Sequence, residues 1–126
     1  MEFSELQKIA QETLNERRFS KLATAGTVAA AVLTEKGNVY TGICIDVPAG
    51  MGFCAEHAAA AAMVTAGESK IVKMVATGVD DNSCGGAPCG RCSEFINCQH
   101  DDIYLCEVLL EDGSITTIGE LLPYRL

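Results

Sequence analysis

The sequence predicts an α/β protein, built as one layered domain of 126 residues. Segments rich in β-branched residues alternate along the chain with segments that have helical periodicity or a high alanine content. Such alternation is typical of a sheet covered by helices. The length is that of one domain of about 100–200 residues, so we expect residues 1–126 to form a single domain.

The first half of the chain predicts one helix and a β-hairpin. Apolar residues recur at helical spacing over residues 4–18, and Ser4 is a suitable N-cap. Residues 24–34 and 39–45 are rich in β-branched side chains and flank a turn-forming sequence over residues 35–38. Two such segments joined by a turn that contains glycine and asparagine are typical of a hairpin.

The second half of the chain predicts two helices and three further strands. A loop over residues 46–53 leads into an alanine-rich segment, which favours a helix over residues 54–66 that is buried on most sides. Pro88 is well placed to precede a second, shorter helix over residues 89–97. The remaining strands are expected over residues 71–78, 103–110 and 114–118.

The charge balance and the apolar runs exclude several classes of partner. The chain has 9 Lys and Arg against 17 Asp and Glu, a net charge of −8 with histidine neutral. Such a surface repels polyanions, so we expect no polymeric nucleic acid as a partner. The longest apolar run, Ala58–Val64, is far shorter than the roughly 20 residues of a membrane span, so we expect no membrane partner. The N-terminal residues lack the pattern of a secretory signal, which indicates a cytoplasmic protein.

Seven cysteines are many for a cytoplasmic chain. In a reducing compartment they favour metal binding or catalysis over disulfides. Cys89 and Cys92 form a CxxC motif at a predicted helix start, where the helix dipole stabilises thiolate charge. This motif alone fits a redox site, a structural zinc site or a catalytic zinc site.

A second segment, Cys54-Ala55-Glu56, favours the catalytic zinc site because it adds a third thiolate at another helix start. Three protein ligands with an open fourth position define a catalytic zinc site, whereas a fourth protein ligand closes a structural one. Glu56 points to a different side of its helix from Cys54, so it is placed to carry protons rather than to bind the metal.

Two other classes of protein remain as alternatives. A structural-zinc binding module would need a fourth ligand, and Cys84 is the nearest candidate. A redox protein would use the CxxC motif alone. Neither alternative gives Glu56 a role. The other cysteines have no comparable context, and we expect small buried side chains at Cys44, Cys84, Cys98 and Cys106.

Together, Cys54-Ala55-Glu56 and Pro88-Cys89-Gly90-Arg91-Cys92 resemble the two-part zinc motif of the cytidine deaminase superfamily. The hairpin TVAAAVLTEKGNVYTG and the closing GELLP are also similar to the small three-cysteine branch, which includes cytidine deaminase and blasticidin-S deaminase. The resemblance implies a three-layer α/β/α fold with a mixed five-stranded sheet. It also implies a homotetramer that holds Zn²⁺ and hydrolyses the C4 amine of a cytosine-type nucleoside, with cytidine or deoxycytidine as the default substrate. The implied metal ligands are Cys54, Cys89 and Cys92, and Glu56 is the implied catalytic acid and base.

The resemblance also implies roles around the substrate. Cys44 and Asp46 stand where the family has an asparagine and a glutamate that hold the ribose, and the backbone at Ala55 corresponds to part of the ring-binding set. A modified cytosine nucleoside such as blasticidin S is therefore the alternative substrate. His57 stands where an arginine often follows the motif, and either His57 or Arg91 is expected to offset the thiolate charge from behind the ligands. An ordinary packed helix histidine is the other interpretation of His57.

Overall fold

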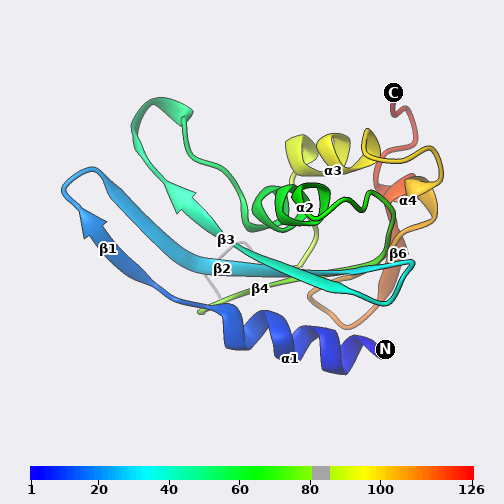
Figure 1. The fold of residues 1–126 in the computed structure, drawn as a ribbon, viewed down its shortest axis with the longest axis horizontal. Coiled ribbons are helices and arrows are strands. Elements are labelled where there is room, and N and C mark those ends of the chain that lie inside the picture. The colour runs from blue at the N-terminus through cyan, green and yellow to red at the C-terminus, as the bar shows by residue number, and fades with distance from the viewer. Residues whose placement is uncertain (81–85) are drawn as a thin grey trace.

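The computed structural model describes residues 1–80 and 86–126, and Figure 1 shows a sheet with helices on both faces. One helix lies against one face, and two helices lie side by side on the other with a short fourth helix next to them. The expected three-layer α/β/α arrangement is therefore confirmed. The helices are α1 (Phe3–Thr13), α2 (Ala55–Thr65), α3 (Gly90–Asn97) and α4 (Ile118–Leu121). Within the described ranges, no helix is both long and apolar enough to cross a bilayer.

The sheet is mixed and has six strands. Its centre is β2, which pairs antiparallel with β1, β3 and β4, whereas β4 and β5 are parallel and β5 and β6 are antiparallel. The strands are β1 (Arg17–Ser20), β2 (Ala23–Thr34), β3 (Val39–Asp46), β4 (Ile71–Gly78), β5 (Glu107–Leu109) and β6 (Ile115–Thr117). Two short 3₁₀ helices, η1 (Pro48–Gly50) and η2 (Ile103–Leu105), interrupt the loops.

Strand β2 is buried on both faces and separates two apolar cores. Val28 and Val32 belong to the larger core beneath α2 and α3, whereas Leu33 packs with Leu6 of α1 in the smaller core. Because successive side chains of a strand point to opposite faces, one strand of small and branched residues serves both cores. This double burial explains why its sequence is an almost continuous apolar run.

Three elements differ from the sequence-based prediction. The sheet has a sixth strand, β1, whose four residues are all exposed and therefore lack an apolar alternation. The first helix ends at Thr13 and does not continue to residue 18. The strand predicted over residues 103–110 is divided into η2 and β5, with Ile103 and Cys106 buried three positions apart. That spacing is helical rather than alternating, which accounts for the 3₁₀ turn.

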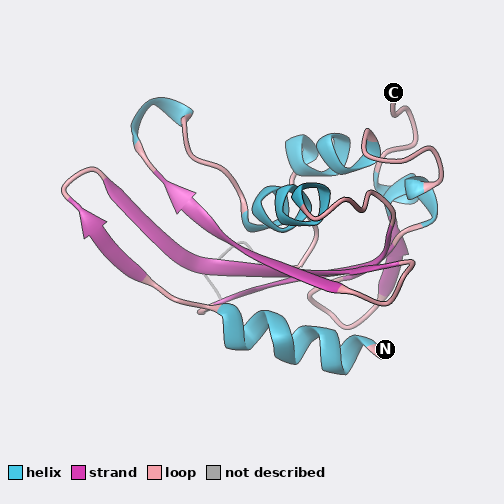
Figure 2. Cartoon of the chain, viewed as in Figure 1, coloured by secondary structure: helices cyan, strands magenta, loops and turns pink. Residues whose placement is uncertain are grey.

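The hairpin strand β3 approaches α2 so closely that one position requires glycine. A Cβ built on Gly42 would collide with the backbone nitrogen of Ala59 and lie 2.6 Å from the Cβ of Ala58. Downstream of this contact, β3 continues through the η1 loop to the start of α2, as Figure 2 shows. The contact at Gly42 therefore sets the height of α2, and of the residues at its N-terminus, above the sheet.

The substitution Gly42→Ala tests this contact. Because backbone atoms of α2 oppose the added methyl group, we expect a loss of about 1–3 kcal/mol in the free energy of unfolding. The measurement is chemical denaturation of the purified chain. Gly90→Ala is the matched control, since a Cβ there would meet nothing within 4 Å, and its stability should not fall. Equal stability of wild type and Gly42→Ala would contradict the proposed role of the contact.

Candidate active site

Three cysteines converge where two helices begin. Cys54 is the N-cap of α2, Cys89 is the N-cap of α3, and Cys92 lies in the first turn of α3. Their sulfur atoms all lie within 4.8 Å of one another, and the Sγ atoms of Cys54 and Cys89 are 3.6 Å apart. Among the described residues, this is the one group of three or more potential ligands that could hold a metal ion.

The spacing of the sulfur atoms fits a zinc ion. Tetrahedral zinc with Zn–S distances of about 2.3 Å holds its sulfur ligands about 3.8 Å apart. The observed distance of 3.6 Å between Cys54 and Cys89 is close to that value. Three cysteines without a fourth His or Cys in the described cluster leave one coordination position for a small molecule. The three cysteines are thus positioned to bind a metal ion.

The thiols titrate differently because their surroundings differ. Burial raises the pKa of the Cys54 thiol, and it raises the pKa of the fully buried Cys92 thiol even more strongly. Burial also acts on Cys89, but hydrogen bonds from the backbone and side chain of Cys92 outweigh it and lower the pKa of Cys89. The backbone N–H of Cys92 donates to the Sγ of Cys89 at 3.5 Å. A bound cation would favour the thiolate form of all three.

Glu56 lies in the first turn of α2, beside the cysteine cluster but outside the group of ligands. Its side chain is only 4% exposed, and burial raises the pKa of its carboxyl group. A carboxyl group with a raised pKa can exchange protons with a substrate near neutral pH.

A cleft of about 880 Å³ opens in front of these residues, a volume within the range of small-molecule sites. Cys54, Cys89 and Glu56 line it together with the three residues that the resemblance assigned to the substrate. Those three are Cys44, Asp46 and Ala55. The structure therefore brings two of the three predicted metal ligands, the predicted catalytic residue and the predicted substrate contacts to one cleft, with Cys92 buried behind Cys54 and Cys89 in the same cluster.

Three residues that the sequence analysis did not single out also line the cleft: Glu16, Thr27 and Phe53. The Oγ1 of Thr27 lies 3.3 Å from the Sγ of Cys44. Phe53 immediately precedes Cys54, and this adjacency is the only signal in the sequence that could have indicated it. Glu16 and Thr27 are far in sequence from both halves of the motif, so only the fold could place them.

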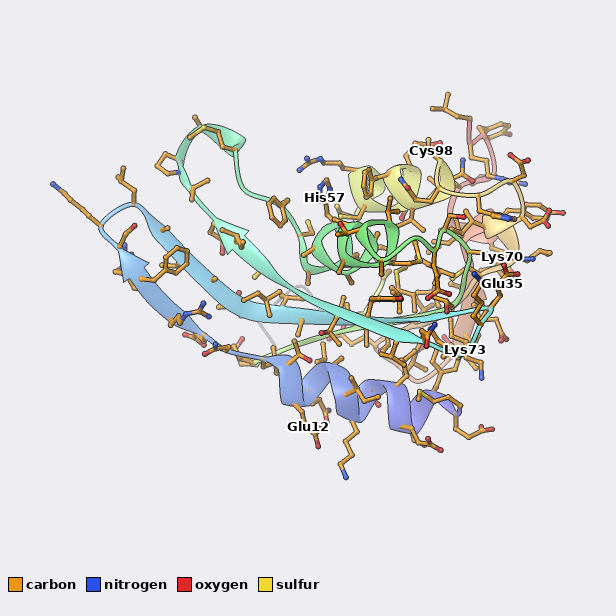
Figure 3. All side chains as sticks on the ribbon, in the orientation of Figure 1. Glu12, Glu35, His57, Lys70, Lys73 and Cys98 are labelled. Atoms are coloured by element: carbon orange, nitrogen blue, oxygen red, sulfur yellow. The ribbon has the colours of Figure 1, made fainter. Side chains whose placement is uncertain are left out.

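His57 and Arg91 lie next to the cluster in different settings. The His57 ring is stacked between Phe53 and Phe95, with ring centroids 5.0 and 4.3 Å away. Figure 3 shows His57 on the outer side of α2, next to α3. Its buried Nδ1 has no hydrogen-bond partner in the described part of the chain, and burial and the charge of Arg91 lower its pKa. Arg91 lines the cleft and donates to the carbonyl oxygen of Gly52 at 3.4 Å.

The predicted burial of the remaining cysteines is confirmed for some and wrong for one. Cys44 and Cys106 are buried as predicted. Cys98 is exposed, so its predicted burial is wrong; it follows the last turn of α3, at the surface shown in Figure 3. Cys84, the candidate fourth ligand, lies outside the described residues.

The fold and the cleft together define an α/β protein with a three-cysteine candidate metal centre, and this fold is that of bacterial cytidine deaminases. Cytidine deaminase from Mycobacterium tuberculosis is similar with a TM-score of 0.78 and 24% identity, over 100% of this chain and 98% of that chain. The enzyme from Mycobacterium leprae has a TM-score of 0.77 and 24% identity, over 98% of each chain. That from Burkholderia pseudomallei has a TM-score of 0.76 and 23% identity, over 100% of each chain.

The similarity lies in the structure rather than in the sequence. No family model matches the chain, and no curated protein is found to be similar to it. At 23–24% identity, the solved structures establish the fold.

The cysteine cluster predicts how individual substitutions change metal content. Cys92→Ser should lose the bound metal, because it removes a buried ligand of the cluster and serine oxygen is a poor zinc ligand. Elemental analysis of the purified chain gives the metal content per chain. Cys98→Ser is the matched control, and it should keep one equivalent of metal. Metal loss in Cys84→Ser would instead indicate a fourth ligand and a structural site.

Proposed function

We propose that this protein is a zinc-dependent hydrolase that removes the C4 amine of a cytosine-type nucleoside or a related compound. One observation carries the proposal: the cleft is lined by a buried carboxylate together with two members of a three-cysteine cluster. The solved structures of similar fold are named as cytidine deaminases, which supports the same class of reaction.

The zinc ligands in this proposal are Cys54, Cys89 and Cys92. When bound, zinc lowers the pKa of a coordinated water and so supplies a nucleophile at neutral pH. Thiolates survive best in a reducing compartment, which agrees with the proposed cytoplasmic location.

Glu56 carries the protons of the reaction. Its carboxylate accepts a proton from the attacking water and donates it to the ring nitrogen next to C4. It then accepts the remaining hydroxyl proton and delivers it to the amine, which leaves as ammonia. One C–O bond forms and one C–N bond breaks, so the amine becomes a carbonyl without oxidation or reduction. Burial keeps bulk water away from this carboxyl group and holds its pKa above the usual range.

Cytidine or deoxycytidine is the default substrate, which would place the protein in pyrimidine salvage. The ring would contact the backbone at Ala55, and the sugar would lie near Cys44 and Asp46, which line the same cleft. A modified cytosine nucleoside such as blasticidin S is the alternative, because a thiol cannot donate and accept hydrogen bonds as a carboxamide does.

The substitution Glu56→Gln tests the proposed proton transfer. It keeps the shape of the side chain but removes its basicity, so kcat for ammonia release should fall by about 10²–10⁴-fold. The zinc content should stay at one ion per chain. Glu12→Gln, on the exposed side of α1, removes the same charge away from the cleft and should leave kcat unchanged. Ammonia release that persists at the wild-type rate in Glu56→Gln would refute the assignment.

We also propose that the protein is a homotetramer. Helix α2 is apolar on all sides, yet Ala61, Ala62 and Val64 are exposed on the single chain, contrary to the expected burial on most sides. A helix without a polar face is normally covered by protein. Exposed apolar residues at the C-terminus also favour an assembly, since Tyr124 is 98% and Leu126 is 91% exposed. A second copy of the chain would cover both regions.

Light scattering measures the number of chains in the particle. We expect four chains for the wild type and fewer for Val64→Lys, because a charge on the outer face of α2 would be buried without a partner. Glu12→Lys changes charge on another helix and should keep the wild-type mass. A monomeric wild type with full activity would exclude this assembly.

A further inference from the structure

The ring-on-ring contacts of the chain are concentrated beside the cysteine cluster. Both such stacks found in residues 1–80 and 86–126 include His57, with Phe53 on one side of its ring and Phe95 on the other. The His57 ring is inclined by 29° to the Phe53 ring and by 15° to the Phe95 ring, so the three rings are close to parallel. None of the three side chains belongs to the group of metal ligands, and the proposed proton transfer uses none of them.

The three rings come from three different parts of the fold. Phe53 lies in the loop before α2, His57 in the first turn of α2, and Phe95 in α3. Phe53 is tied to the sheet, because its backbone N–H and C=O exchange hydrogen bonds with Ile45 of β3, both of 3.0 Å. The stack therefore connects a fixed point on β3 to the starts of both helices.

The stack also lies one helical turn from the cysteines. His57 follows Cys54 by three positions in α2, and Phe95 follows Cys92 by three positions in α3. Residues three apart are neighbours on one face of a helix. The His57 and Phe95 rings, with centroids 4.3 Å apart, therefore continue the contact that the cysteines make between the same two helices, which lie side by side in Figure 1.

A hydrogen bond at the Nδ1 of His57 does not explain the position of the ring. This atom is buried and has no hydrogen-bond partner in the described part of the chain. A buried polar atom without a partner costs free energy. Stacked aromatic rings, in contrast, are stabilised by the contact of their faces and hold a preferred separation. The ring between α2 and α3 (Figure 3) is therefore held by its flat, apolar faces.

We infer that His57 is a positioning residue of the metal centre: its ring, stacked between Phe53 and Phe95, sets the separation of the two helix N-termini that carry the cysteines. This inference rests on the metal centre of the function proposed above and does not depend on the substrate. Zn–S bonds have a fixed length of about 2.3 Å, so ligands from two helices can share one ion only when the helices begin at the correct distance. The ring acts by its shape and not by its charge.

Two substitutions of His57 separate the shape of the ring from its polarity. His57→Gln keeps a polar side chain but removes the ring, so the Kd for Zn²⁺ should rise by about tenfold or more, as when other supports of metal ligands are lost. His57→Phe keeps a flat ring but removes both nitrogen atoms, and its Kd should stay within about twofold of the wild type, well below that loss. Titration of the zinc-loaded protein with a chromogenic chelator measures each Kd. Weaker binding in His57→Phe together with tighter binding in His57→Arg would indicate a role through charge and overturn the inference.

The other side of the stack provides an independent test. Phe95→Leu removes the ring on α3 but leaves His57 and every cysteine in place, and it should also weaken zinc binding. Met63→Ala is the matched control, because Met63 is fully buried in α2 but lies outside the stack. It should lower the stability of the chain in chemical denaturation and keep the wild-type Kd for Zn²⁺. Unchanged binding in Phe95→Leu, or an equal loss of binding in Met63→Ala, would each refute a specific role of the stack.

The absorption spectrum of the cobalt-loaded protein reports the geometry of the ligands. Zn²⁺ has a filled d shell and no visible bands, whereas the bands of Co²⁺ depend on its coordination geometry. His57→Phe should keep the wild-type spectrum, and His57→Gln should shift the bands because its sulfur ligands are held less well. A wild-type spectrum in His57→Gln would contradict the inference.

Zinc binding and ammonia release together separate the inference from the proposed function. Wild-type protein that binds zinc equally well with and without the stack would overturn the inference but keep the deaminase. The expected order of zinc affinities, with no ammonia released from cytidine, would support the inference and count against the proposed reaction. Wild-type protein that binds no zinc would refute the metal centre, and both proposals with it.

Discussion

The close packing of α2 on β3 is the constraint on which the candidate site depends. Gly42 lets the two backbones approach, and this places Cys54 and Glu56 above the strand that carries Cys44 and Asp46. Helix α3 then needs only to begin beside α2 to complete the cluster. The geometry of the cysteines is therefore a consequence of how two helix N-termini are held on one face of the sheet, and not of any single loop.

That placement concentrates groups whose ionised forms are stable together only with a cation. Burial raises the pKa values of Cys54, Cys92 and Glu56, so it disfavours the ionised form of each group. A bound metal ion would displace the protons from the thiols and stabilise the ionised cluster. The two helix N-termini contribute further positive potential. The same crowding that would destabilise three free thiolates makes the cluster a strong site for a divalent ion.

The sequence predicted the parts of this arrangement that depend on local signals. The alanine run and the cysteine motif indicated where α2 and α3 begin, because helix propensity and N-terminal residues act within a few positions. It did not predict β1, whose exposed RRFS residues lack periodicity. Helix α1 ends early because the chain must pass Gly26, where φ is +85° and a Cβ would collide with the carbonyl of Asn15. Such long-range contacts, like those that bring Glu16 and Thr27 to the cleft, give no signal in the sequence around each residue.

The two residues proposed to offset the thiolate charge of the cluster differ in their own charge. Burial between two aromatic rings and the nearby guanidinium both lower the pKa of His57 from 6.5, so its imidazole is largely neutral at pH 7. Arg91 carries a guanidinium, which is a cation. It lies between two of the cysteines in sequence and holds the carbonyl of Gly52, two residues before Cys54. Arg91 is thus the better candidate to balance the thiolates, and His57 is better explained as an apolar spacer that keeps α2 and α3 apart at the correct distance.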